Sequence, residues 1–404
     1  MSKEKRRVPK LRFPGFTEDW EQRKLGDFTT QINTFVNPED AKLPLWSLTA
    51  EAGLIEKTDR YERDFLVKKK DQFKRIETNT LVYNPMNITI GSIDIYTGLY
   101  PIAVSGYYVS IVYDKNIDTD FLKEVLLLPS SLKMYKNYAT GSLIERQRVQ
   151  YPTFSKLQLL FPNLDEQRAI GQLFKSLNLN ITLHQRKLEH LNLKKKALLQ
   201  KLFPKNGERY PKLRFPGFTD AWEQRKLGDL YKRVNERNDG TLGRDKWISV
   251  AKMYFQDPDK VQSNNLDTRT YVMKKGDIAF EGHPNNEFKF GRFVLNDIGT
   301  GIISELFPIY RPITEYDLDF WKYAIQLERV MAPIFAKSIT SSGNSSNKLD
   351  HNHFLNQELL VPNIEEQKKI GTLLSILSKN ITLHQRKLEH LQLQKKALLQ
   401  QMFV

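Results

Sequence analysis

The chain has 404 residues, a net charge of +15 and no cysteine. This length accommodates two or three domains that each bury a core of their own. The missing cysteine excludes disulfide bonds, thiolate nucleophiles and cysteine zinc sites, and it is typical of a reducing compartment. No stretch approaches the roughly 18 apolar residues that span a bilayer, and the charged N-terminus is not a secretory signal. We therefore expect a soluble protein of the cytoplasm.

The first element in chain order is a segment that occurs twice. Residues 9–27 read PKLRFPGFTEDWEQRKLGD, and residues 211–229 agree with them at 17 of 19 positions. A second repeat includes the identical residues 180–191 and 380–391. The stretches between these repeats are nearly unrelated to each other. The chain is therefore a duplicated frame that holds two divergent inserts, and a frame kept twice suggests that a partner docks on it twice.

Each insert combines short apolar runs with a helical stretch, which predicts an α+β fold. In the first insert, the expected strands and helix are Leu81–Tyr83, Ile93–Tyr96, Tyr107–Tyr113 and Asp120–Leu128. The expected counterparts in the second insert are, in the same order, Ile278–Phe280, Phe293–Leu295, Ile302–Ser304 and Phe320–Leu327. Shared landmarks pair Gly91 with Gly291, Ser105 with Ser304 and Phe154 with Phe354. We interpret the inserts as two divergent copies of one fold.

A long helix with a 4–3 spacing of apolar residues follows each insert. The seam positions are Leu177, Ile181, His184, Leu188, Leu191 and Leu198 in the first helix, and Leu377, Ile381, His384, Leu388, Leu391 and Leu398 in the second. A heptad pattern held over four repeats indicates a coiled coil. We expect the two helices to pair in antiparallel fashion in a pseudo-two-fold symmetric molecule. Four polar seam residues are interpreted as positions that set the register: His184, His384, Lys195 and Lys395.

The basic excess lies in the repeated segments, and the two inserts are close to neutral. A basic excess by itself is also explained by solubility or by an acidic protein partner. Phosphate contacts need a basic face. An insert that binds DNA must therefore place its acidic residues away from that face.

The sequence contains no recognised catalytic motif. It has no GxxxxGK[ST] phosphate loop, no GxGxxG fingerprint and no GxSxG elbow. Asn84-Pro85-Met86-Asn87 approaches an adenine-methyltransferase signature but lacks its second proline and its aromatic residue, so an ordinary turn is expected. No acidic or cysteine cluster completes a metal site around His351-Asn352-His353, where a polar loop or helix start is expected. We expect neither a catalytic nor a metal site.

Because the sequence contains no catalytic motif, we consider the recognition of DNA bases as the function. It uses Arg, Lys, Asn and Gln at base edges, with further basic groups on phosphates. The candidates in the first insert are Lys68, Lys69, Lys70, Lys74, Arg75, Gly141, Ser142, Arg146 and Arg148. The candidates in the second are Asn285, Asn286, Lys289, Arg292, Asn344, Asn347 and Lys348. Both inserts place a loop of small residues at the same offset and fill it differently. The alternative is that these lysines and arginines form solvated faces and that the loops are only flexible.

Together these features resemble the specificity (S) subunit of type I restriction-modification enzymes. Each insert is closed by a P-x-[LI]-x-EQ segment and a long helix, and the repeated opening segments resemble those of bacterial members. The resemblance covers essentially the whole chain. It implies a division into an N-terminal arm with target-recognition domain 1, a first helix, a linker with the repeated opening, target-recognition domain 2 and a second helix, at residues 1–161, 162–203, 204–227, 228–361 and 362–404.

The resemblance implies a non-catalytic subunit of the bacterial cytoplasm. Each target-recognition domain would read one half of an asymmetric, bipartite site in double-stranded DNA, and the helices would set the spacer. Two methyltransferase subunits and two restriction-translocase subunits would dock on the frame. S-adenosylmethionine, ATP and Mg would belong to those partners, and this chain would bind no cofactor. The competing hypothesis is a coiled-coil scaffold whose two globular domains bind proteins, as a mimic or regulator of such a system.

Overall fold

The computed structural model describes residues 7–57, 72–141, 147–205, 207–261, 269–342 and 346–404. The chain divides into two compact units. Unit 1 comprises Met1–Gln185 and Lys387–Val404, and unit 2 comprises Arg186–Arg386. Both boundaries fall inside the long helices, so the units are divided differently from the segments expected from the sequence. The reason is that the two ends of each helix pack into the cores of different units.

The two long helices are α4 (Leu164–Lys201) and α9 (Ile364–Met402). Each begins at an asparagine cap, because Asn163 Oδ1 accepts a hydrogen bond from the Glu166 amide at 3.0 Å, and Asn363 Oδ1 accepts one from the Glu366 amide at 2.9 Å. The observed bounds lie within about two residues of the expected ones. Within the described residues, no helix is both long and apolar enough to cross a membrane.

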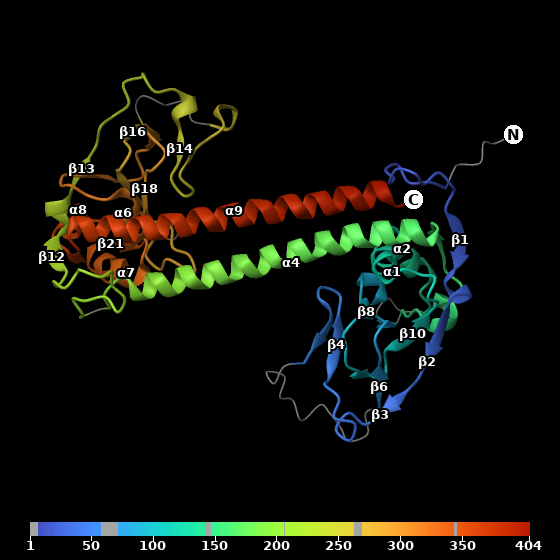
Figure 1. The fold of residues 1–404 in the computed structure, drawn as a ribbon. Helices are drawn as coiled ribbons and strands as arrows, with labels where there is room; N and C mark the ends of the chain where they lie inside the picture. The colour runs from blue at the N-terminus through green and yellow to red at the C-terminus, as the bar shows by residue number, and fades with distance from the viewer. Residues whose placement is uncertain (1–6, 58–71, 142–146, 206, 262–268, 343–345) are drawn as a thin grey trace. The chain divides into compact units, whose positions relative to one another are not determined.

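Within each unit, the start of one long helix lies beside the end of the other, with opposite chain directions (Figure 1). In unit 2, Leu198 and Leu199 of α4 pack on the same core as Ile370 and Leu374 of α9. In unit 1, the ends are exchanged, and Leu398 and Leu399 of α9 pack on the core that contains the start of α4. All the expected seam positions are buried or half-buried, and most of the residues between them are exposed.

A four-stranded antiparallel sheet forms the centre of each unit. In unit 1 its order is β2 (Thr29–Ile32), β10 (Val109–Tyr113), β7 (Thr80–Tyr83) and β8 (Ile93–Tyr96). In unit 2 its order is β13 (Tyr231–Val234), β20 (Ile309–Pro312), β17 (Ile278–Glu281) and β18 (Arg292–Leu295). The same strand order in both units confirms that the inserts are copies of one α+β fold.

Smaller sheets complete the β structure. In unit 1 they pair β1 (Glu21–Lys24) with β11 (Gln158–Phe161), β4 (Trp46–Thr49) with β5 (Gly53–Glu56), and β6 (Phe73–Ile76) with both β3 (Phe35–Val36) and β9 (Ile102–Ser105). In unit 2 they pair β12 (Glu223–Lys226) with β23 (Glu358–Val361), β14 (Ile248–Ser249) with β15 (Tyr254–Phe255), β16 (Thr270–Met273) with β19 (Gly301–Ser304), and β21 (Ile339–Ser342) with β22 (Asn347–Leu349). Most ladders of unit 1 therefore have an equivalent in unit 2, and the ladder of β3 with β6 is reduced there to an isolated bridge between Arg237 and Tyr271.

Short helices cover the inserts. Unit 1 contains α1 (Thr119–Leu126), α2 (Pro129–Tyr138), α3 (Tyr151–Phe154) and the 3-10 helix η3 (Ile88–Ile90). Unit 2 contains α5 (Leu227–Leu230), α6 (Leu318–Ala324), α7 (Glu328–Ser338) and α8 (His351–Leu355). Helices α1 and α6 begin at the caps Asp118 and Asp317, which accept hydrogen bonds from the Phe121 and Phe320 amides.

One expected strand correspondence is wrong. The run Ile302–Ser304 lies in β19, which is equivalent to β9 of unit 1 and not to the strand expected at Tyr107–Tyr113. That strand is β10, and its equivalent is β20. The two runs are similarly apolar, and only their pairing separates them: β19 pairs with β16, whereas β20 lies inside the central sheet. The landmark that pairs Ser105 with Ser304 was the better guide.

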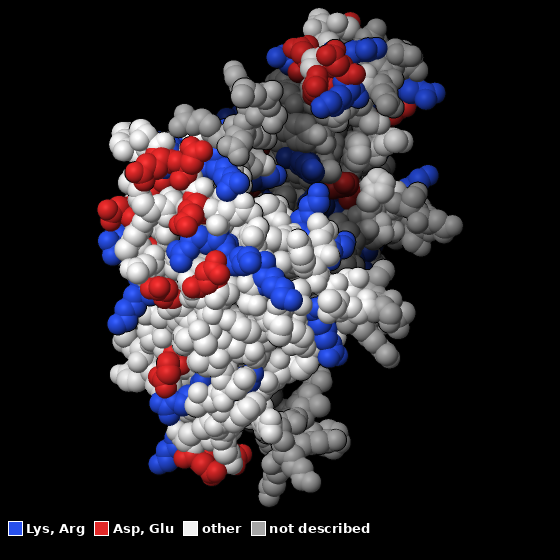
Figure 2. All heavy atoms as spheres, turned by 90° about the vertical axis from the view of Figure 1, so that its right-hand side faces the viewer, with Lys and Arg blue, Asp and Glu red and all other residues white. Residues whose placement is uncertain are grey.

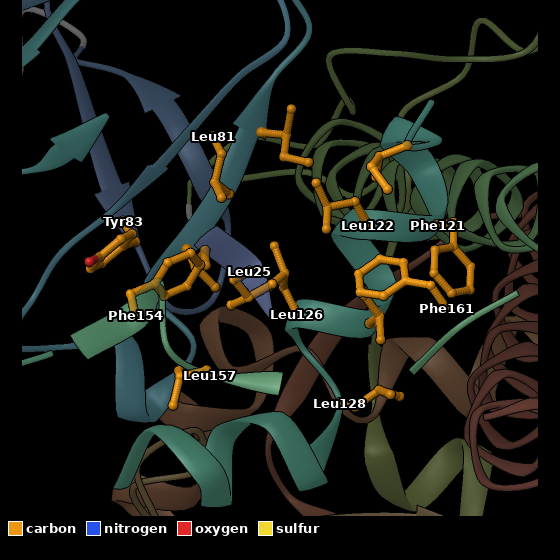
Figure 3. Close-up of a cluster of buried hydrophobic side chains, with 14 of the residues drawn as sticks. Leu25, Leu81, Tyr83, Phe121, Leu122, Leu126, Leu128, Phe154, Leu157 and Phe161 are labelled. Atoms are coloured by element: carbon orange, nitrogen blue, oxygen red, sulfur yellow. The ribbon is translucent and has the colours of Figure 1, made fainter. Parts of the chain in front are cut away.

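Both faces of each central sheet are covered, which explains the continuous apolar runs of its strands. In unit 1, Leu81 and Tyr83 of β7 belong to a core with Phe121 of α1 and Phe154 of α3 (Figure 3). The residue between them, Val82, belongs to a second core on the other face. Alternate residues of one strand thus serve two cores, and β17 and β18 repeat this arrangement in unit 2.

In unit 1, the opening segment contacts the end of α9. In unit 2, the second opening segment makes the same contact with the end of α4, from which it continues along the chain. The Leu11 amide donates to Gln401 O at 2.9 Å, and the Leu213 amide donates to Lys201 O at 2.9 Å. Phe403 packs edge-on against Trp20, as Phe203 packs against Trp222. The short linker after α4 therefore has a non-covalent equivalent at the end of α9.

Candidate nucleic-acid interface

The two repeated motifs bind each other inside each unit. Arg12 of the opening segment forms two hydrogen bonds with Glu166 at the start of α4, at 2.6 and 2.7 Å. Arg214 forms the same pair with Glu366 at the start of α9, at 2.8 Å for both bonds. Both glutamate side chains are almost completely buried. The hydrogen bond to Glu166 raises the pKa of the Arg12 guanidinium above its ordinary value.

The glutamine that follows each glutamate attaches the insert to the helix. Gln167 Oε1 accepts a hydrogen bond from the Asp118 amide at 3.0 Å, and Gln167 Nε2 donates to Pro162 O at 2.9 Å. Gln367 makes the equivalent bonds with Asp317 and Pro362. One turn later, a Cβ on Gly171 or Gly371 would overlap an oxygen of the aspartate that caps α1 or α6.

These contacts account for much of the repetition through folding alone. The buried members of both motifs satisfy one another within a unit, so their identity requires no external partner. Other identical positions are exposed, and folding does not explain those. Leu183 and Leu383 expose 52% and 64% of their surfaces, and Leu193 and Leu393 expose 68% and 67%.

The seam lysines, which the sequence predicts as register-setting positions, also contact the inserts. In unit 1, Lys395 Nζ lies 3.1 Å from Glu124 Oε2 of α1. In unit 2, Lys195 Nζ lies 5.1 Å from the ring centroid of Tyr323 in α6. Burial lowers the pKa of Lys195 below its ordinary value. One repeated lysine thus anchors two inserts through different chemistry, an ion pair and a cation–π contact.

Most of the candidates in insert 1 either lie outside the described residues or contact other side chains and backbone groups. Lys68, Lys69 and Lys70 lie outside the described residues, as do Ser142 and Arg146. Lys74 is buried in β6, where its Nζ donates to Tyr108 O at 2.7 Å and burial lowers its pKa. Arg75 is partly exposed and pairs with Glu77. The geometry of Lys74 is that of a structural residue.

The remaining candidates of insert 1 lie on a pair of loops. Arg148 forms a short antiparallel bridge with Thr140, and Gly141 follows directly after that bridge. The Arg148 guanidinium lies 5.7 Å from the ring centroid of Tyr107. The next amide, that of Val149, donates to Pro85 O at 3.0 Å and so joins this loop to the one that follows β7.

In insert 2, three candidates, Asn285, Asn286 and Lys289, lie on the loop between β17 and β18, and the fourth, Arg292, begins β18. Asn285 Oδ1 caps a local turn, accepting hydrogen bonds from the Glu287 and Phe288 amides. Asn286 and Lys289 are exposed. Arg292 is held in place, because its Nε donates to Glu281 at 2.8 Å and its guanidinium also donates to Ala251 O.

The last candidates of insert 2 lie on the hairpin of β21 and β22. Asn347 and Lys348 begin β22, and Asn344 lies outside the described residues. The Asn347 amide donates to Gly282 O at 2.8 Å, and a Cβ on Gly282 would overlap Asn347 O. The hairpin therefore lies against the loop 282–291, as the segment 147–150 lies against residues 84–87 in unit 1.

The equivalent loop pairs carry different side chains. Gly91 and Gly291 mark the same left-handed turn, with φ values of 97° and 90°. In insert 1, the described residues of the pair include no acidic residue, whereas insert 2 places Glu287 beside its lysine and arginine. The face drawn in Figure 2 mixes basic and acidic side chains. Basic side chains without acidic neighbours in the same segment therefore occur on particular loops of the described residues.

The two motifs that approach a methyltransferase signature and a metal site have local structural roles. Asn84-Pro85-Met86-Asn87 is a turn, in which Asn84 Oδ1 accepts from the Met86 amide at 3.0 Å. His351 begins α8, with Asp350 as its cap. No group of three or more potential metal ligands occurs in the part of the chain that the structure describes.

Comparison with solved structures identifies the class of fold. No model of a protein family matches the sequence. The structure nevertheless has the fold of a type I restriction-modification S subunit.

The match is with the crystal structure of the type I restriction-modification system S subunit from M. genitalium, with a TM-score of 0.61 and 12% identity. It covers 98% of this chain and 99% of that one. The HsdS subunit from Thermoanaerobacter tengcongensis matches at 15% identity, with a TM-score of 0.43 and coverage of 95% and 96%. A structure from work on assembly and conformational transition of the type I R-M system matches at 14%, with a TM-score of 0.43 and coverage of 98% and 99%.

Proposed function

We propose that this chain is the non-catalytic specificity subunit of a type I restriction-modification enzyme. Each insert reads one half of an asymmetric bipartite site in double-stranded DNA. The two long helices, which continue from one unit into the other, set the unspecified spacer. The protein acts in the bacterial cytoplasm and binds no cofactor itself.

One observation carries this proposal: the same pair of loops occurs in both units with unrelated side chains. The frame, the sheet order and the loop positions are repeated. The residues that fill the loops are not, since one pair contains Ile90 and Arg148 and the other contains Asn286 and Lys348. A fold held constant beneath variable loops is the arrangement expected of a recognition module.

The partners follow from the exposed part of the repeat. Each unit presents two large apolar side chains at identical positions of the repeat: Leu183 and Leu393 in unit 1, and Leu193 and Leu383 in unit 2. Identical surfaces presented twice fit identical partners in pairs. We assign them to two methyltransferase subunits, with two restriction-translocase subunits joining the complex. S-adenosylmethionine, ATP and Mg are then bound by these partners.

The alternative function is a scaffold whose two inserts bind proteins. The exposed leucines of the helices fit this alternative as well as they fit the proposal. The loops distinguish the recognition function from the scaffold, because a protein-binding scaffold does not require side chains that contact DNA bases.

The test mixes the purified chain with its methyltransferase and a pool of random duplexes, and sequences the duplexes that are retained. The proposal predicts enrichment of one split sequence with two unlike halves. A scaffold would retain no sequence preferentially at any salt concentration. The adenine methylation pattern of the host genome provides an independent readout and should show the same split site.

A further inference from the structure

An apolar surface with basic neighbours occurs on the loop pair of unit 1. It is formed by the loop 84–92 after β7, which contains η3, and by α2, which packs against η3. The segment 147–150 joins it through the hydrogen bond from Val149 to Pro85. We call the exposed residues Met86, Ile90 and Tyr138 the apolar edge of unit 1.

The exposure of these three side chains is high for residues of their size. Met86 exposes 38% of its surface, Ile90 64% and Tyr138 57%. Single exposed apolar residues are normal on any protein, but adjoining ones mark an interaction surface. The buried neighbours explain the fold of this region without them, since Ile88 and Tyr135 fill the core below. The apolar edge is thus available for a ligand.

Charge identifies the class of ligand. The segments 84–92, 129–141 and 147–150 contain Lys133, Lys136 and Arg148 and no aspartate or glutamate. Both lysines are exposed on α2. Segments that carry three cations and no acidic residue, in an insert that is neutral as a whole, complement a polyanion.

Apolar side chains also read DNA bases in one particular way. In the major groove, the C5 methyl group of thymine is the feature that an apolar side chain contacts. We propose that the apolar edge of unit 1 reads thymine methyl groups in one half-site, with Lys133, Lys136 and Arg148 on the neighbouring phosphates. This inference rests on the proposed function. Insert 2 has amides and basic groups at the equivalent place and would read its half-site through hydrogen bonds.

Deoxyuridine tests the inference, because it differs from thymidine only by the missing methyl group. The probe is the duplex enriched from the random pool, synthesised with deoxyuridine in place of thymidine in one half at a time. Binding by the chain with its methyltransferase should weaken about fourfold for each methyl group lost in the half read by unit 1, the value of one buried methyl group. The same replacement in the other half should change binding by less than about twofold.

Variants assign the effect to the apolar edge. Ile90→Ala should remove most of the difference between the thymidine and deoxyuridine probes, and it should fold normally because Ile90 is exposed. The matched control is Leu99→Ala, which removes a side chain that is 89% exposed on the turn between β8 and β9. It should leave the difference unchanged.

The outcomes separate the two proposals. If no sequence is enriched from the pool, the proposed function fails and this inference fails with it. If a split site is enriched but deoxyuridine changes binding in neither half, or Ile90→Ala leaves its effect intact, the recognition function stands and the thymine reading is wrong.

Discussion

At the scale of single residues, the most informative contact is the buried pair of Arg12 and Glu166, with its copy at Arg214 and Glu366. The sequence gives no direct sign of it, because the partners are 154 and 152 residues apart. The available signal was that both motifs recur together in each half of the chain. Taken by themselves, acidic residues at a helix start indicate an interaction with the helix dipole. Tertiary pairing of the buried glutamate overrides that local interpretation.

Arg12→Met should destabilise unit 1 strongly. It leaves Glu166 buried without its charged partner, which typically costs about 3–5 kcal/mol of unfolding free energy. Adding Glu166→Gln should recover part of the loss, because the buried charge is then gone. Urea unfolding followed by circular dichroism measures both variants.

The control for this pair is Arg168→Met. Its partner Asp165 is 83% exposed and the arginine itself 61%. The expected cost is below about 1 kcal/mol. Equal losses from Arg12→Met and Arg168→Met would show that the buried pair does not hold the opening segment on the helix.

At the scale of elements, the long helices were predictable and the small strands were less so. The 4–3 spacing extends over many residues, so the helix ends follow from the pattern and its asparagine and proline boundaries. Strands such as β19 and β20 are four residues each, and no periodicity distinguishes them. The described loop candidates of insert 2 lie on two adjoining loops, whereas Lys74 was not recognisable as a buried residue. Its burial depends on β3 and β9, which are distant in sequence.

The insert–helix contact makes a prediction at this scale. Lys395→Met should destabilise the protein more than Lys195→Met, although the two lysines occupy equivalent positions. The first change leaves Glu124 buried beside Asn178 without a cation, at a cost of about 3 kcal/mol. The second removes a cation–π contact worth about 1–2 kcal/mol and also relieves the burial of an amine. Thermal melting of the two variants compares them directly, and the reverse order would contradict the assignment of these contacts.

At the scale of the whole molecule, the end of each long helix contacts an opening segment. In unit 2 a linker joins the two along the chain, whereas in unit 1 the equivalent contact is non-covalent. The hydrogen bond from Leu11 to Gln401 repeats the one from Leu213 to Lys201. A linker like residues 204–210 could therefore join Val404 to Pro9. The duplication was evident in the sequence. It was not evident that the two ends of each helix pack into the cores of different units, because this packing depends on how the helices pair.

A circularly permuted chain tests this description. Val404 is joined to Pro9 by a copy of residues 204–210, and new ends are opened at Gly207. The permuted protein should have the same circular dichroism spectrum and a similar melting temperature, since every packing contact is kept. A control permutation opened inside β7 should lose stability, because it interrupts the central sheet. Similar losses from both permutations would refute the equivalence of the two junctions.

The most direct test of the central claim replaces residues 230–361 by a second copy of residues 28–161. The frame can accept this exchange, since Lys195 would meet the copied glutamate as Lys395 meets Glu124. If each unit reads one half of the site, the duplexes selected by this protein with its methyltransferase should carry the same bases in both halves. Selection of the original asymmetric site, or loss of all selection by a protein that still folds and binds its methyltransferase, would contradict the account.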